Sequence, residues 1–225
     1  PVMREVNLHI PYGQRVALVG PSGAGKTTIS ALLLRLYDPD QGAVAIGGLN
    51  IRHCVGRELR NHFGVVPQDP FLFRTTIREN LRIVAADADD EQMEAACRMA
   101  NAWEFIERLP RGLDTVVGEA GSTLSGGQRQ RLAIARSLLT HASYFIFDEA
   151  TSALDTVSER LIQEAMQRVT EGRTAVIIAH RLATVQHCDR IVVMQDGRVV
   201  QDGTYDELVA ADGLFREMVE TQTLG

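Results

Sequence analysis

The sequence predicts an α/β fold in which helices cover both faces of a mostly parallel sheet. Two observations predict it. Short apolar runs typical of buried strands alternate with amphipathic helical segments, and a glycine-rich turn joins one such strand directly to a helix. The length of 225 residues suits one well-buried core and is short for two full domains. We therefore expect a single domain over residues 1–225.

The first part of the chain contains four expected strands and one helix. Val6–Ile10 alternates apolar and polar residues, as a half-buried strand does, whereas Arg15–Gly20 is a continuous apolar strand. Lys26–Leu36 has apolar residues at helical spacing. Two further strands are expected at Ala43–Ile46 and Phe63–Val66.

The rest of the chain begins with a mostly helical stretch from Thr75 to Leu139, with helices at Asp90–Ala102 and from Ser125 onward. Strands and helices then alternate, which predicts parallel strands covered on both faces. The expected strands are Tyr144–Phe147, Thr174–Ile178 and Arg190–Met194, and the expected helices are Val157–Val169 and Leu182–Gln186. A hairpin turn at Gly197 and two short helices complete the pattern.

Composition narrows the class of protein. The formal net charge of −6 argues against bulk affinity for nucleic acid, which usually needs a basic face. No apolar run approaches the roughly 18 residues that span a bilayer. The three cysteines lack metal-ligand spacing, which favours reduced thiols in a cytosolic protein. The chain opens with Pro1 and soon reaches the glycine-rich turn, so we expect a piece excised from a longer polypeptide.

The glycine-rich turn fits the pattern G-x-x-x-x-G-K-[ST] of a phosphate-binding loop. Its glycines let backbone N–H groups surround a triphosphate, the lysine adds a charge, and the first threonine offers a hydroxyl to Mg²⁺. An incidental lysine in a structural turn is the alternative, but the strand before and the helix after favour a phosphate site. The candidate residues are Gly20, Pro21, Ser22, Gly23, Ala24, Gly25, Lys26, Thr27 and Thr28.

Two carboxylates, Asp148 and Glu149, follow the expected strand at 144–147. Ligand chemistry collects at the carboxyl ends of parallel strands, where Gly20 also emerges. One carboxylate there can hold Mg²⁺ and the other can polarise an attacking water. Gln68 and His180 also follow expected strands, although sequence physics alone favours a surface amide and a structural histidine.

Residues 124–128 read Leu-Ser-Gly-Gly-Gln, and this motif after a phosphate-binding loop resembles the signature of ABC-type ATPases. The resemblance covers essentially the whole chain. It implies a RecA-like P-loop NTPase core with a mostly parallel sheet, an inserted α-helical subdomain and a flanking antiparallel β subdomain. In this division, residues 1–70 and 140–225 form the core with the β subdomain. Residues 71–139 form the helical subdomain that carries the signature.

The resemblance also implies site roles and the substrate, ATP with Mg²⁺. Catalytic roles go to Glu149 as the base, His180 as the switch at the terminal phosphate, Gln68 and Lys26. Metal ligation goes to Thr27, Gln68 and Asp148. Residues 151–155 resemble the D-loop, which contacts a partner subunit. The family pairs head to tail, so that ATP on one phosphate loop meets the partner's signature, and a homodimer and a heterodimer both stay open. The signature residues are Ser125, Gly126, Gly127 and Gln128.

The subtype that the chain resembles is the ABC exporter. The segments that carry this resemblance are residues 71–73, 76–80, 115–119, 202–204 and 206–208. It implies an ATPase domain at the cytoplasmic face of a membrane that powers substrate export, with a transmembrane domain fused upstream of Pro1. Tyr12 sits too close to the loop to be the family's adenine-stacking aromatic. We expect that residue upstream, and ATP affinity weakened by roughly 1–3 kcal/mol without it.

Two rival classes are weighed against the exporter. The first is a soluble ABC-type ATPase in DNA repair, chromosome maintenance or translation. Chromosome-type members separate loop and signature by long coiled coils, and translation-type members usually carry two cassettes. The second is a P-loop kinase of small molecules, which has no place for the signature or the D-loop. The exporter is therefore favoured, and the exported substrate stays open.

Overall fold

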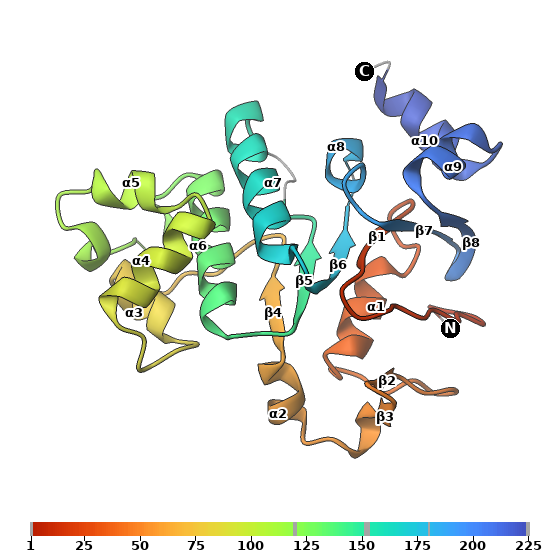
Figure 1. The fold of residues 1–225 in the computed structure, drawn as a ribbon, viewed down its shortest axis with the longest axis horizontal. Helices are drawn as coiled ribbons and strands as arrows, with labels where there is room; N and C mark the ends of the chain where they lie inside the picture. Colours follow the sequence, from red (N-terminus) through yellow and green to blue (C-terminus); the bar gives the residue numbers. More distant parts are fainter. Residues whose placement is uncertain (1, 119–120, 151–153, 180, 224–225) are drawn as a thin grey trace.

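The computed structural model describes residues 2–118, 121–150, 154–179 and 181–223. Its centre is a six-stranded sheet in the order β4-β5-β6-β1-β7-β8 (Figure 1). All neighbours are parallel except β7 and β8, which form an antiparallel hairpin. The strands are β1 Arg15–Val19, β4 Phe63–Val66, β5 Tyr144–Asp148, β6 Thr174–Ile178, β7 Arg190–Gln195 and β8 Arg198–Gly203. The predicted α/β fold with a mostly parallel sheet is confirmed.

Alternate residues of the strands bury their side chains on opposite faces of the sheet. On one face Val16 and Leu18 pack with Ile29 of α1 (Lys26–Leu33). On the other face Ala17 and Val19 join a larger core that includes the inner faces of α6 (Gly126–Leu139) and α7 (Thr156–Thr170). Because both faces of the central strands are buried, odd and even positions are both apolar, and each strand is a continuous apolar run in the sequence.

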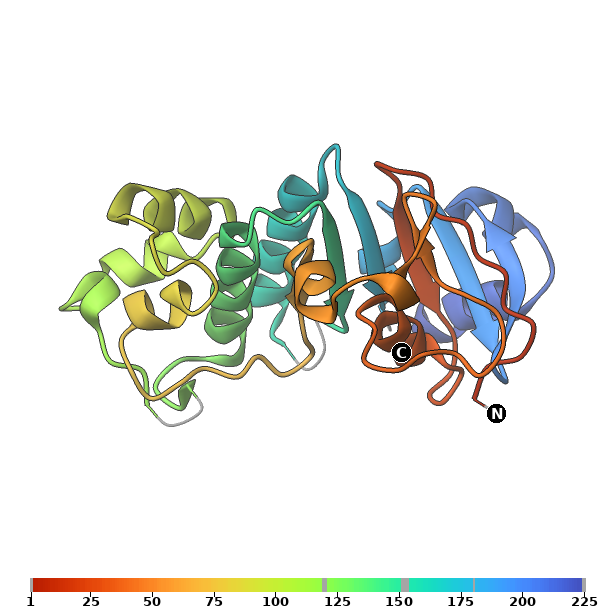
Figure 2. The same cartoon turned by 90° about the horizontal axis from the view of Figure 1, so that it is seen from below.

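The helices of the middle segment begin where side chains cap them. Thr76, Asp89 and Ser125 each accept a hydrogen bond from the third helical residue in a capping box, so these starts follow from local sequence. Seen along the sheet, these helices lie on the side of the sheet away from β7 and β8 (Figure 2). They are α3 Ile77–Arg82, α4 Asp90–Met99, α5 Trp103–Glu107 and α6, with a short 3₁₀ turn at Gly112–Asp114.

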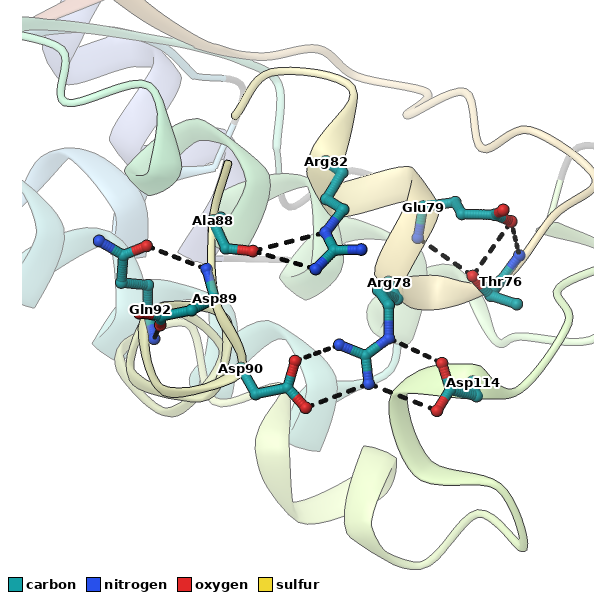
Figure 3. Close-up of polar contacts among 9 residues, drawn as sticks. All are labelled: Thr76, Arg78, Glu79, Arg82, Ala88, Asp89, Asp90, Gln92 and Asp114. Carbon is teal, nitrogen blue, oxygen red and sulfur yellow. Dashed lines mark hydrogen bonds and ion pairs between the residues drawn. The ribbon is translucent and has the colours of Figure 1, made fainter. Parts of the chain in front are cut away.

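One arginine joins three of these pieces. Arg78 of α3 forms a bidentate ion pair with Asp90 at the start of α4 (Figure 3). Its Nε also donates to Asp114 Oδ1 at 2.7 Å, at the end of the 3₁₀ turn. The backbone continues this connection, because Val117 N–H donates to the carbonyl oxygen of Thr75 at 2.9 Å. The segment before the signature is thereby fixed to the start of α3.

Smaller elements flank the sheet. β2 and β3 form a short antiparallel pair, which together with the β7–β8 hairpin supplies the expected antiparallel structure. The predicted turn at Gly197 lies between β7 and β8, and two helices follow. These elements are β2 Ala45–Ile46, β3 Leu49–Asn50, a 3₁₀ turn at Ile51–His53, α2 Gly56–Asn61, α8 Leu182–Val185, α9 Tyr205–Ala210 and α10 Leu214–Thr223.

The predicted strand at Val6–Ile10 is wrong. Its apolar residues do face inward, and Leu8 and Ile10 pack on the α1 side of the core. However, the segment has no strand assignment, and the carbonyl oxygen of His9 accepts from the Arg190 side chain at 2.7 Å. Alternation of apolar and polar residues indicates that one side of an extended segment is buried. A segment that lies along a sheet without pairing to it shows the same pattern. A strand additionally needs a backbone partner.

Two predicted helices end early, for the same reason. α1 stops at Leu33 and α4 at Met99, because Arg35 and Asn101 adopt left-handed backbones with φ of 50° and 55°. Each closes a Schellman motif, in which Leu36 N–H donates to the Ala31 carbonyl and Ala102 N–H to the Cys97 carbonyl. Glycine usually marks such a stop and asparagine sometimes does, so the stop at Arg35 has no signal in the sequence and the one at Asn101 has a weak one. At other ends the differences are small: β2 lacks residues 43–44 and α8 ends before residue 186.

Candidate functional site

The glycine-rich loop lies between β1 and α1, where the backbone can be formed only by glycine at two points. Gly20 has φ of 144°, and a Cβ there would lie 2.0 Å from the carbonyl oxygen of Met194. Gly25, the N-cap of α1, is left-handed with φ of 101°. The strand thus passes close to β7 and then turns sharply into the helix, so that the N-terminus of α1 opens at the loop.

Lys26, the first residue of α1, extends its side chain back to the start of this loop. Its side chain is buried, and Nζ donates to the carbonyl oxygens of Gly20 at 2.7 Å and Pro21 at 3.0 Å. Burial lowers the pKa of the Lys26 ammonium, and the nearby charges of Glu149 and Asp148 oppose that shift. The lysine is therefore held within electrostatic reach of both carboxylates, while residues 21–23 and Thr27 are exposed at the surface of the loop.

The two carboxylates lie two strands away, at the end of β5. Asp148 is in register with Ile178 of β6, and Leu18 of β1 is in register with the same residue. The strand ends are thus level, as the sequence predicts for a parallel sheet. Glu149 N–H donates to the carbonyl oxygen of Ile178 at 2.9 Å, and Glu149 has a left-handed backbone with φ of 47°. Such strain costs about 1–2 kcal/mol in a non-glycine residue and is concentrated at functional sites.

Gln68 extends the same edge of the sheet from β4. It is exposed just beyond the strand, and the preceding carbonyl, of Pro67, accepts a hydrogen bond from Gln130 Nε2 at 3.0 Å. Gln130 is 2% exposed on α6, so the helix that begins at the signature is fastened to the Gln68 segment. Gln130 was not among the residues predicted for the site. Its helical spacing with the buried Ala133, Ile134 and Ser137 was the available signal.

The signature forms the N-terminus of α6. Ser125 Oγ accepts from Gln128 N–H at 3.2 Å, and Gln128 Oε1 accepts from Ser125 N–H at 2.8 Å. Ser125 is exposed and Gly127 is buried. The α6 helix packs against β4, three strands from β1 in the sheet, so the signature and the phosphate loop belong to different parts of the fold (Figure 1). One chain thus presents two anion-binding helix N-termini at separate places.

Three predicted segments fall outside the described residues, wholly or in part: His180, residues 151–153 of the expected D-loop, and Glu119. Tyr12 is described and is exposed. Its ring meets Tyr144, at the first residue of β5, edge to face with ring centroids 6.5 Å apart. This is the amino-terminal edge of the sheet, opposite the loop at Gly20. The position agrees with the expectation that Tyr12 does not stack on adenine.

The donor set at the carboxyl edge suits magnesium. Thr27, Gln68 and Asp148 offer a hydroxyl, an amide and a carboxylate oxygen, and Mg²⁺ prefers oxygen ligands. Among the described residues, no group of three or more histidine, cysteine or acidic side chains forms a metal cluster. A site with one carboxylate fits Mg²⁺ in particular, because this ion is usually held by one or two carboxylates together with substrate phosphates.

Comparison with known proteins identifies the family. The family model described as "ABC transporter" matches residues 3–152. The chain belongs to the ABC transporter family. This family hydrolyses ATP to power transport. Within the described ranges, no helix has both the length and the apolar character needed to cross a bilayer.

Individual relatives and one solved structure are similar over nearly the whole chain. The human mitochondrial potassium channel ATP-binding subunit is 51% identical over 99% of this chain, and the ATP-dependent lipid A-core flippase of Chromohalobacter salexigens is 48% identical over 98%. The chain spans 30% and 38% of the lengths of these two relatives. A bacterial Atm1-family ABC exporter with ATP bound matches with a TM-score of 0.93 and 44% identity, covering 98% of this chain and 39% of that one.

Proposed function

We propose that this chain is the ATP-hydrolysing domain of an ABC exporter, which turns the energy of ATP into export of a substrate across a membrane. One observation carries the proposal: the buried Lys26 of the phosphate loop lies within electrostatic reach of both Asp148 and Glu149 at one edge of the sheet. The similarity to a flippase and to an Atm1-family exporter supports the export role over the soluble alternatives.

Each residue of the edge has a role in this mechanism. The loop amides and Lys26 bind the phosphates and stabilise the negative charge that develops on the transferred group. Glu149 polarises the attacking water, and Gln68 and His180 orient the water and the terminal phosphate. Thr27, Asp148 and Gln68 would hold Mg²⁺, which supplies charge neutralisation at the phosphates.

The separation of loop and signature supports a head-to-tail dimer. An ATP on one phosphate loop is then covered by Ser125–Gln128 of a second such domain, whose own ATP is covered in return. The partner is a copy of this chain or a related domain. Residues 71–139 act as the helical subdomain, and residues 1–70 and 140–225 as the core. A transmembrane domain, fused in the same polypeptide, places the ATPase at the cytoplasmic face of a membrane.

Two variants test the proposal. Glu149→Gln should abolish steady-state ATP turnover while ATP-dependent dimers persist on gel filtration, because the base is lost and the phosphate contacts stay. Ser125→Arg should block ATP-driven dimerisation by crowding the partner's phosphates. Normal turnover in Glu149→Gln, or an unchanged dimer fraction in Ser125→Arg, would contradict the assignment. Exchanging an exposed carboxylate elsewhere, by Glu220→Gln on α10, is the matched control and should change neither measurement.

A further inference from the structure

An ion pair joins the residue after the expected switch histidine to the helix after the expected D-loop. Arg181 donates from a guanidinium nitrogen to Glu159 Oε2, and Gln163 Nε2 donates to Glu159 Oε1 at 3.2 Å. The Glu159 side chain is 14% exposed and Arg181 39%, so the pair is partly shielded from water. Because the pair is partly buried and Glu159 also binds Gln163, its geometry is better defined than that of an exposed ion pair.

The chain just before Arg181 is also anchored, at Ala179. Ala179 N–H donates to the carbonyl oxygen of Leu18 at 3.2 Å, and Leu18 belongs to β1, the strand that leads into the phosphate loop. The carbonyl oxygen of Arg181 accepts from Thr184 N–H at 3.2 Å, which begins α8. The two chain neighbours of residue 180 are therefore both anchored, Ala179 to β1 and Arg181 to Glu159.

The Glu159 end is equally well anchored. Asp155 caps α7 by accepting from the N–H groups of Val157 at 3.1 Å and Ser158 at 3.0 Å. The next turn includes Glu159, whose N–H donates to the Asp155 carbonyl at 2.9 Å. Gly127 of the signature helix packs directly on Ser158, leaving no room for a Cβ. The first turn of α7 is thus held by its cap and by its close packing against α6.

We propose that Glu159 and Arg181 are positioning residues for hydrolysis, because their ion pair holds Arg181, the chain neighbour of the expected switch residue His180. This inference rests on the proposed function, because it assumes the switch role of His180. Neither side chain needs to contact ATP. Loss of the pair should therefore lower kcat for ATP hydrolysis about tenfold or more, since misplacements near 1 Å cost up to 10²-fold, and should leave KM for ATP within about twofold.

A double-mutant cycle in kcat tests the proposal. Glu159→Ala, Arg181→Ala and the double variant are assayed for ATP turnover over a range of ATP concentrations, and binding of a fluorescent ATP analogue is measured in parallel. If the residues act as one unit, the double variant is no slower than the slower single variant. Arg181→Lys keeps the charge and should recover part of the rate. Glu164→Gln, which removes an exposed carboxylate from the same helix, is the control and should keep the wild-type rate.

The outcomes separate this inference from the proposed function. The inference is overturned if the single variants have a kcat within twofold of wild type. It is also overturned if the fold reduction in kcat of the double variant equals the product of the two single reductions. A merely structural pair would lower the melting temperature of the variants without this pattern in kcat. If the unmodified protein hydrolyses ATP, Glu149→Gln does not, and Arg181→Ala retains full kcat, only the positioning role fails. Absence of turnover in the unmodified protein overturns the proposed function and this inference together.

Discussion

Gly127 of the signature helix lies where no larger residue fits, and this gives a quantitative prediction for Gly127→Ala. A Cβ built at Gly127 lies 2.5 Å from Ser158 Oγ and 2.6 Å from Ser158 Cβ. Carbon atoms pack favourably at about 3.5–4.0 Å, so the first turns of α6 and α7 would have to separate by about 1 Å. Rotating the serine moves Oγ but leaves its Cβ in place.

The expected cost follows from two opposing effects. Overpacking of this kind costs about 1–3 kcal/mol, whereas alanine gains about 0.5–1 kcal/mol over glycine in a helix. We expect Gly127→Ala to lower the free energy of unfolding by about 1–2 kcal/mol. In a domain of this size, each kcal/mol lowers the melting temperature by about 2–4 °C.

The assay is urea unfolding followed by circular dichroism at 222 nm without nucleotide, so that only the packing is measured. Adding Ser158→Gly to Gly127→Ala removes both clashing atoms and should recover most of the loss. Gly126→Ala is the matched control, because its Cβ would meet only the flexible ends of two side chains, Leu154 Cδ2 at 3.2 Å and Arg129 Nη2 at 3.9 Å. Wild-type stability in Gly127→Ala, or a loss that Ser158→Gly does not relieve, would refute the packing argument.

Two further predictions concern the helical segment. Arg78 holds the pKa values of Asp90 and Asp114 below their usual range, so the unfolded chain binds more protons near pH 4 (Figure 3). This stabilisation is present above about pH 4 and is lost as the pH falls below it. When the pH is lowered from 6 to 2.5, the melting temperature of Arg78→Gln should therefore fall less steeply than that of the unmodified protein. Asn80 is fully buried, and its side chain is hydrogen-bonded to the backbone of Phe73 and Thr76. Asn80→Ala should cost about 2–4 kcal/mol in urea unfolding, and a loss under 1 kcal/mol would contradict this role.

The central strands and the site motifs could be predicted because their signals are local. The strands at 63–66 and 174–178 were predicted at their observed bounds. The N-cap at Ser125 follows from a serine three residues before a glutamine. In each case, neighbouring residues in the sequence both carry the signal and form the contacts. The placement of the carboxylates beside the phosphate loop also follows, because parallel strands bring their carboxyl ends to one edge.

The contacts that hold the site in place could not be predicted, because they join distant parts of the chain. Gln130 reaches Pro67 across 63 positions, and Arg181 reaches Glu159 across 22. Nothing near Gln130 or Arg181 in the sequence marks its partner. The left-handed stop at Arg35 was missed for another reason. Arginine favours continuing a helix, and only tertiary packing beyond Leu33 stabilises the left-handed conformation at this position.

The left-handed backbone of Glu149 allows the site geometry to be tested apart from activity. Glu149→Gly and Glu149→Val both lack the carboxylate, so neither should hydrolyse ATP, but they differ in how well they fit φ of 47°. Glycine adopts this conformation without strain, whereas β-branched valine is strained by about 1–2 kcal/mol more.

The greater freedom of glycine in the unfolded chain offsets about 0.5–1 kcal/mol of that difference. Glu149→Gly should therefore remain the more stable variant by about 1 kcal/mol in urea unfolding. Equal stability, or a more stable valine variant, would mean that residue 149 is not held in the left-handed conformation. In that case the hydrogen bond from its N–H to Ile178 would not fix the Glu149 carboxylate, the proposed base, at the edge of the sheet.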